Sequence, residues 1–126
     1  MTNLTVVIPA KNESESLPTV LDYFSNKNYK VCVVLEKSDI KTIESIKTKK
    51  CKIVYQTKKG FGNALTEGIN QSETKYFCIF NADGSMRIEE IDLMLDKISK
   101  SNDDIIFASR YEKDGKSDDD TLVTLL

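Results

Sequence analysis

The segment YFCIFNADGSM, residues 76–86, joins an apolar run directly to a short polar turn that contains Asn81 and Asp83. The apolar run predicts a buried strand. In an open parallel sheet, ligands bind in the crevice outside the carboxyl ends of the strands. The segment therefore predicts that Asp83 is a carboxylate that faces a ligand.

A second segment, LTVVIPAKNE at residues 4–13, has the same construction. Its apolar residues stop at Pro9, and Asn12 and Glu13 follow. Parallel strands have their carboxyl ends at one edge of a sheet. We therefore expect the polar residues that follow the two strands to lie at the same edge.

Helical and strand patterns alternate along the rest of the chain. Apolar spacing predicts helices within residues 17–24, 40–46, 61–69 and 88–98, and apolar runs predict strands at 31–35, 52–55 and 105–108. This alternation predicts an α/β fold, a three-layer sandwich with a mainly parallel sheet, in which right-handed crossovers align the strand ends. The polar residues expected at that edge are Asn12, Glu13, Glu36, Asn81, Asp83 and Arg110.

The length of 126 residues predicts a single domain. Residues 111–126 show no clear pattern, although Leu122, Val123, Leu125 and Leu126 suggest the start of a helix. An apolar helix start at the end of a chain is typical of a fragment. We therefore expect residues 1–126 to be the N-terminal part of a longer enzyme, with 111–126 a loop and the start of its acceptor region.

Composition excludes several classes of function. With 18 Lys and Arg against 20 Asp and Glu, the net charge of -2 gives no basic field for nucleic acid. Histidine is absent, which excludes Ser-His and Cys-His nucleophiles and imidazole zinc sites. Cys32, Cys51 and Cys78 stand singly in apolar stretches, as expected of reduced thiols in a cytoplasmic protein. No signal peptide pattern and no apolar run of about 20 residues is present.

The segment KKGFGN, residues 58–63, places two lysines and two glycines just before a predicted helix. The free amides and the dipole of a helix N-terminus can receive an anion. The segment lacks the Gly-x-Gly-x-x-Gly of dinucleotide-binding folds and the Gly-Lys-Ser of phosphate loops. Dinucleotide reduction and ATP hydrolysis are therefore disfavoured.

The order of these segments resembles the nucleotide-binding half of the inverting family-two glycosyltransferases, which have a Rossmann-like GT-A fold. It is particularly similar to polyprenyl-phosphate sugar synthases such as dolichyl-phosphate mannose synthase. The matching segments are residues 6–13, 59–65, 80–85 and 109–111. The resemblance covers the whole chain in the correct order, and it implies that about half of such an enzyme, including much of the acceptor site, lies outside these residues.

The resemblance implies roles for individual residues. Asp83 matches the second carboxylate of the Asp-x-Asp signature, which holds Mg²⁺ or Mn²⁺ on a nucleoside diphosphate, and Asn81 stands in place of the first. Arg110 matches an arginine that reaches the diphosphate or the acceptor phosphate, so Asp83 and Arg110 are the expected catalytic residues. The expected nucleotide-binding residues are Pro9, Ala10, Asn12, Glu13, Glu36, Lys59, Gly60, Asn63, Asn81 and Asp83.

Structural roles compete with these assignments. Asp83 or Ser85 can cap a helix, and Glu36 can be a solvated loop charge with Asp39 taking its place at the nucleotide. Arg110 can belong to a surface ion pair.

By the same resemblance, the expected function is transfer of a sugar from a GDP- or UDP-sugar, with inversion, to an acceptor such as a polyprenyl phosphate. Such an acceptor implies a peripheral membrane location for the full-length protein, and exposed edges imply a homodimer of the fragment. One alternative is a sugar-1-phosphate nucleotidyltransferase, which is disfavoured because no glycine-rich loop with an arginine follows the first strand. The other is a non-catalytic nucleotide-binding fragment.

Overall fold

The computed structural model describes residues 3–106 and 124–125, and the side chains within residues 3–104. The chain divides into two compact units, Met1–Met86 and Arg87–Leu126. None of the described helices combines the length and the apolar composition that a membrane span requires.

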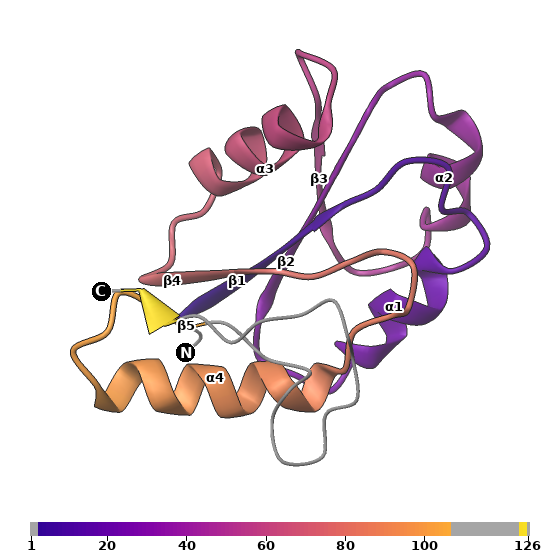
Figure 1. The fold of residues 1–126 in the computed structure, drawn as a ribbon. Coiled ribbons are helices and arrows are strands. Elements are labelled where there is room, and N and C mark those ends of the chain that lie inside the picture. The colour runs from indigo at the N-terminus through magenta and orange to yellow at the C-terminus, as the bar shows by residue number, and fades with distance from the viewer. Residues whose placement is uncertain (1–2, 107–123, 126) are drawn as a thin grey trace, which may run out of the picture. The chain divides into compact units, whose positions relative to one another are not determined.

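The first unit is a parallel sheet with helices between its strands (Figure 1). Its sheet has the order β3-β2-β1-β4, and every neighbouring pair is parallel. The predicted α/β fold with a parallel sheet is confirmed. The elements in chain order are β1 Leu4–Pro9, α1 Leu17–Tyr23, β2 Lys30–Leu35, α2 Ile40–Ser45, β3 Lys52–Tyr55, α3 Phe61–Asn70 and β4 Tyr76–Ile79.

Strand order creates a topological switch point between β1 and β4. The chain adds β2 and β3 on one side of β1 and then returns to place β4 on its other side. Loops that leave two such strands diverge, and the crevice between them is where open α/β sheets bind ligands. The loops that follow β1 and β4 are those that carry Asn12 and Asp83.

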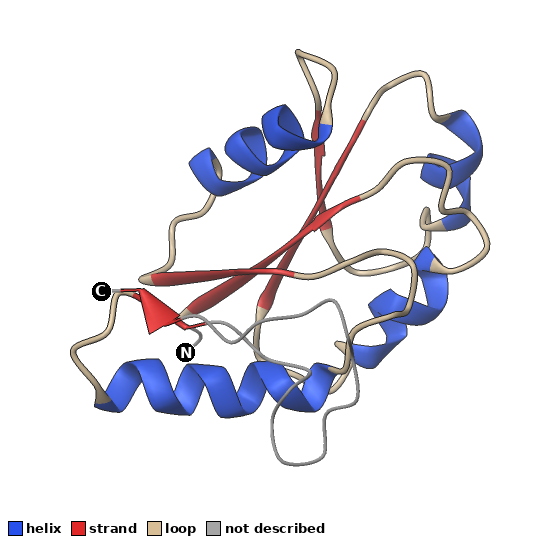
Figure 2. Ribbon diagram, in the orientation of Figure 1, coloured by secondary structure: helices blue, strands red, loops and turns tan. Residues whose placement is uncertain are grey.

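One face of the sheet packs against α3 (Figure 2). Val7, Cys32 and Val34 form a buried cluster with Ala64 of this helix. Gly68 lies so close to the sheet that an added Cβ would be 2.5 Å from Val7 Cγ1 and 2.7 Å from Val34 Cγ2. A glycine at this position therefore allows the helix to approach the sheet closely.

The opposite face is also buried, which explains why the strands are apolar without alternation. Val6, Ile8 and Val33 have no exposed surface. Helix α1 lies on the other side of the sheet from α3 (Figure 1), and the predicted stripe of Leu17, Val20, Leu21 and Phe24 is buried. The Phe24 ring meets Phe80 edge to face, with centroids 5.2 Å apart.

Helix α2 forms where it was predicted, and its predicted apolar stripe is buried in part. Ile46 is buried and Ile43 is half-buried as expected, but Ile40 is 61% exposed, whereas Thr42 is fully buried. The reason is chemical, because the Thr42 hydroxyl accepts a hydrogen bond from the main chain of the loop after β1. A buried polar group with a partner is tolerated in a core.

The second unit contains α4 Ile88–Lys100 and the strands β5 Ile105–Ile106 and β6 Thr124–Leu125. Helix α4 has Glu89 and Glu90 in its first turn and Lys97 and Lys100 in its last, as predicted. These charges complement the helix dipole.

Two predictions for this unit were wrong. Residues 105–106 form a strand, but it pairs antiparallel with β6 and does not extend the parallel sheet. Residues 124–125 belong to that pair, although a helix start was expected there. Short apolar runs do not distinguish strand from helix, or one pairing from another. Leu122, Val123 and Leu126 lie outside the described residues.

The cysteines are free thiols, as predicted. Cys32 is buried, and Cys51 and Cys78 are half-buried. Burial raises the pKa of all three thiols, and that of Cys78 rises to about 11. Such thiols are poor nucleophiles at neutral pH.

Candidate functional site

The loop after β1 is held in place by the first turn of α2. Asn12 has a positive φ of 55°, a conformation that asparagine adopts more readily than most residues. Its N–H donates to Asp39 Oδ2 at 2.8 Å, and the N–H of Glu13 donates to Thr42 Oγ1 at 3.1 Å. The two main-chain N–H groups are thus used inside the protein. Neither of these two N–H groups is therefore free to donate to a ligand.

The loop after β3 is shaped by a glycine and by the side chains of Asn63 and Glu67. Gly60 begins α3 with φ 105° and ψ 153°, a conformation that essentially only glycine adopts. The Asn63 side chain donates to the carbonyl of Lys59 at 2.7 Å. The Glu67 carboxylate accepts hydrogen bonds from the N–H groups of Thr57 at 2.9 Å and Lys58 at 3.3 Å. These contacts fix the main chain from which Lys59 extends.

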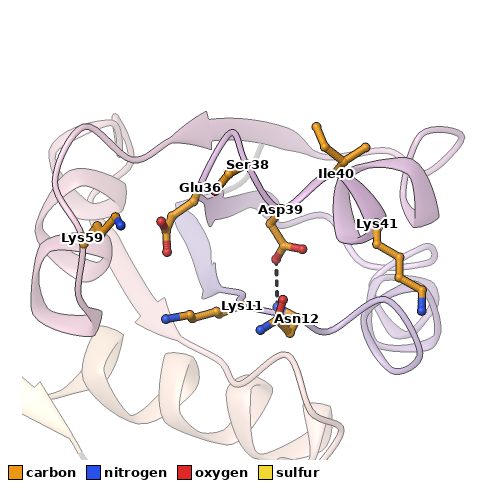
Figure 3. Close-up of a pocket in the computed structure, with 8 residues that line it drawn as sticks. All are labelled: Lys11, Asn12, Glu36, Ser38, Asp39, Ile40, Lys41 and Lys59. Carbon is orange, nitrogen blue, oxygen red and sulfur yellow. Dashed lines mark hydrogen bonds between the residues drawn. The ribbon is translucent and has the colours of Figure 1, made fainter.

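A pocket of about 470 Å³ lies where the loops after β1, β2 and β3 meet (Figure 3). Lys11, Lys59 and the Glu36 carboxylate lie on one side of it, whereas Lys41 lies on the other side. Its lining residues are Lys11, Asn12, Glu36, Ser38, Asp39, Ile40, Lys41 and Lys59. Charges of both signs therefore line one concave surface at the carboxyl edge of the sheet.

A second pocket of about 390 Å³ adjoins the first and shares Asn12, Asp39 and Lys41 with it. Glu13 and Ser16 line this second pocket. The hydrogen bond between the Asn12 N–H and Asp39 involves two of the shared residues.

The loop after β4 is a tight polar turn. Asp83 Oδ1 accepts a hydrogen bond from the Ser85 N–H at 2.9 Å, and the Asn81 side chain donates to Ser85 Oγ at 3.4 Å. Gly84 has φ 82° and closes the turn. Hydrogen bonds from the Ser85 hydroxyl and N–H hold the pKa of Asp83 below its ordinary value. Asp83 is therefore an exposed and firmly ionised carboxylate.

This turn offers a divalent cation two kinds of oxygen, the Asp83 carboxylate and the Asn81 amide. Among the described residues, no group of three or more His, Cys, Asp and Glu side chains could hold a metal ion. Mg²⁺ is commonly bound by one or two carboxylates together with substrate phosphates. The donor set at Asp83 fits that mode of binding.

Residues 5–125 match the sequence profile of glycosyl transferase family 2. The chain belongs to glycosyl transferase family 2. It is 30% identical over 100 residues to an uncharacterized glycosyltransferase of Mycobacterium bovis and to uncharacterized glycosyltransferases of two Mycobacterium tuberculosis strains. Each alignment covers 79% of this chain but 45% of the relative, so the chain spans about half the length of these proteins. No solved structure matches the chain.

For a member of glycosyl transferase family 2, the sheet and its crossovers are consistent with part of a Rossmann-like GT-A fold. The larger pocket brings together Asn12, Glu36 and Lys59 of the predicted nucleotide-binding residues. Asp39, the alternative to Glu36, also lines it.

The remaining predicted residues lie elsewhere. Pro9 ends β1, and the buried Ala10 continues the sheet by donating its N–H to Val34 O at 2.9 Å. Gly60 and Asn63 shape the loop of Lys59. Asn81 and Asp83 lie on the turn after β4, and neither lines one of the two pockets. Arg110 lies outside the described residues.

Three residues around the pockets of this glycosyl transferase family 2 chain were not predicted from its sequence. Lys11 lines the larger pocket, Thr42 fixes the loop after β1, and Ser16 reaches the loop after β4. Of the three, Lys11 was the easiest to predict from the sequence, because it precedes Asn12 in the same polar segment. Thr42 and Ser16 act through contacts between segments far apart in the sequence.

The hydrogen bonds of Glu67 lead us to expect that protein stability depends on pH through this carboxylate, which holds the loop of Lys59. The Thr57 N–H, followed by the Thr57 hydroxyl, the Lys58 N–H and the Lys58 charge, holds the pKa of Glu67 below its ordinary value. The stability that the Glu67 carboxylate contributes is therefore fully present above its pKa in the unfolded chain, and it is lost as the pH falls through its pKa in the folded protein.

In thermal melts over that acidic range, Glu67→Gln is expected to lose less stability than the wild type. Glu44→Gln, at an exposed position of α2, is the control and should follow the wild type. Parallel pH profiles for all three proteins would contradict this account.

Proposed function

We propose that this chain forms the donor-binding part of a glycosyltransferase that transfers a sugar from a nucleotide diphosphate sugar to an acceptor with inversion. The observation that carries the proposal is the pocket at the carboxyl edge of the parallel sheet, with Lys11, Lys59 and Glu36 on one side of it. Membership of glycosyl transferase family 2 supports the same reaction. GDP- and UDP-sugars are the proposed donors.

The charges of the pocket match the parts of such a donor. Lys11 and Lys59 provide two positive charges for a diphosphate. Glu36 and Asp39 are acceptors for the hydroxyls of a ribose or the N–H groups of a base. A volume of about 470 Å³ is within the usual size of small-molecule sites.

In this proposal, Asp83 and Asn81 hold Mg²⁺ or Mn²⁺ against the diphosphate. When bound, the ion would neutralise the negative charge on the departing nucleoside diphosphate. Asn81 contributes an oxygen but no charge, so most of the binding falls to Asp83 and the substrate phosphates. Arg110, by its resemblance to the family arginine, adds a positive charge for the diphosphate or the acceptor phosphate.

The proposed acceptor is a polyprenyl phosphate, as in the enzymes similar to dolichyl-phosphate mannose synthase. A phosphate monoester has a second pKa near ~6 and is already a nucleophile at neutral pH. A hydroxyl acceptor would instead need a general base. A lipid acceptor also places the full-length protein at a membrane surface.

Calorimetric titration of residues 1–126 with GDP, UDP and CDP, each with Mg²⁺ or Mn²⁺, tests the donor site. One of the three nucleotides is expected to bind. Lys59→Ala should weaken its binding by about fivefold to tenfold, because one charged contact to the diphosphate is lost. Lys97→Ala on α4 is a matched control, with the same charge change in the other unit. If no nucleoside diphosphate binds, or if both variants weaken binding equally, the proposed donor site is wrong.

A further inference from the structure

The Ser16 hydroxyl lies between two loops that are far apart in the sequence. Its Oγ is 2.7 Å from Glu13 Oε2, in the loop after β1. It is also 2.7 Å from the main-chain oxygen of Ala82, in the loop after β4. Ser16 and Ala82 are 66 residues apart in the chain. The hydroxyl has one hydrogen, so it donates to one of the two acceptors at a time.

Capping of α1 does not explain this side chain. Ser16 occupies the N-cap position, where a serine oxygen usually accepts a hydrogen bond from an N–H of the first turn. Here φ is -99° and ψ is -33°, and no side-chain capping bond forms. The hydroxyl is directed to the neighbouring loop instead.

The acceptor on the second loop is well placed to control that loop. Ala82 is 4% exposed and stands between Asn81 and Asp83. A contact to its carbonyl therefore acts on the main chain that carries both proposed metal ligands. Strands β1 and β4 are hydrogen-bonded neighbours on the two sides of the switch point, so Ser16 joins the two loops that leave it.

We propose that Ser16 is a positioning residue that fixes the spacing between the loop of Asn12 and Glu13 and the turn of Asn81 and Asp83. The inference rests on the proposed function, in which these two segments hold different parts of one nucleotide diphosphate sugar. A donor held by both loops requires them at one separation, and loops that are already held at that separation reduce the cost of binding.

The first arm of the test uses the ligand-free protein and does not depend on the proposed function. Amide resonances and hydrogen exchange are compared for the wild type, Ser16→Ala, Ser16→Thr and Ser25→Ala. Ser25 is the matched control, because its hydroxyl donates to the Asp22 carbonyl at the other end of α1. In Ser16→Ala, the amide resonances of residues 81–85 should shift and their hydrogens should exchange about fivefold faster. An effect of this size corresponds to the loss of one hydrogen bond. Ser16→Thr retains a hydroxyl and should behave as the wild type, as should Ser25→Ala.

The second arm measures the affinity for the best-binding nucleoside diphosphate in the presence of Mn²⁺. Ser16→Ala should weaken it by about fivefold, and Ser16→Thr should restore it. In an Asp83→Asn background, Ser16→Ala should cause no additional loss, because the turn it positions no longer holds the ion.

The outcomes separate this inference from the proposed function. Unchanged amides at residues 81–85 in Ser16→Ala would overturn the inference whether or not a nucleotide binds. Perturbed amides with unchanged affinity would show that the contact is structural and would overturn the positioning role. If the wild type binds no nucleoside diphosphate, the proposed function fails, whereas the amides still decide whether Ser16 joins the two loops.

Discussion

Asp83→Asn is expected to abolish the gain in nucleoside diphosphate affinity that Mn²⁺ provides, while the protein remains folded. The substitution removes the charge of an exposed, firmly ionised carboxylate and changes almost no volume. An asparagine oxygen can still accept the hydrogen bond that Asp83 Oδ1 receives from Ser85. The structural role is therefore kept and the charge alone is lost.

Calorimetric titration with and without Mn²⁺ measures this effect directly. We divide the dissociation constant measured without Mn²⁺ by the one measured with Mn²⁺. In Asp83→Asn this ratio should fall by at least about tenfold, which is typical of a disturbed metal site. Asp96→Asn is the control, because Asp96 lies on α4, where it pairs with Lys100. An unchanged ratio in Asp83→Asn would remove the metal assignment from this turn.

Phe80→Ala is expected to have the largest effect on stability. Phe80 is 1% exposed, and its ring packs edge to face on Phe24, the residue that caps the C-terminus of α1. Truncation of a buried phenylalanine typically costs about 3–5 kcal/mol of unfolding free energy, because it removes apolar contacts and leaves a cavity. The edge-to-face pair is lost in addition.

Urea denaturation followed by circular dichroism provides the measurement. Phe77→Ala is a matched control on β4, because Phe77 is 49% exposed. It should cost less than about 1 kcal/mol, the range of most surface substitutions. Equal losses for the two variants would contradict the packing of Phe80 between the sheet and α1.

The order of elements was predictable because each apolar pattern acts locally. Leu17, Val20, Leu21 and Phe24 recur at helical spacing, and all four are buried. Strand pairing was harder to predict from the sequence. The pairing of β5 with β6 depends on which strand lies nearby and not on the apolar run itself. The exposure of Ile40 at the start of α2 was mispredicted for a related reason. A hydrophobic pattern favours burial of Ile40, but the hydrogen bond from Glu13 requires Thr42 to face inward.

The site was predictable to the extent that strand ends fix the positions of loops. Asn12, Glu36 and Lys59 follow three different strands, and all three line one pocket. The contact from Ser16 to Ala82 was not predictable, because it depends on how two loops 66 residues apart approach one another. Serine before an apolar helix predicts a cap, and the sequence contains no sign that the hydroxyl turns away from its own helix.

The most direct test of the donor site is the mapping of a bound nucleoside diphosphate by amide chemical shifts in residues 1–126. We expect the largest changes at Lys11, Asn12, Glu36 and Lys59, with changes at residues 81–85 that appear when a divalent cation is added. Diamagnetic Mg²⁺ is the suitable ion, because Mn²⁺ would broaden the resonances. Changes confined to α4, or spread evenly over both units, would contradict the claim that this chain binds the donor nucleotide at the carboxyl edge of its parallel sheet.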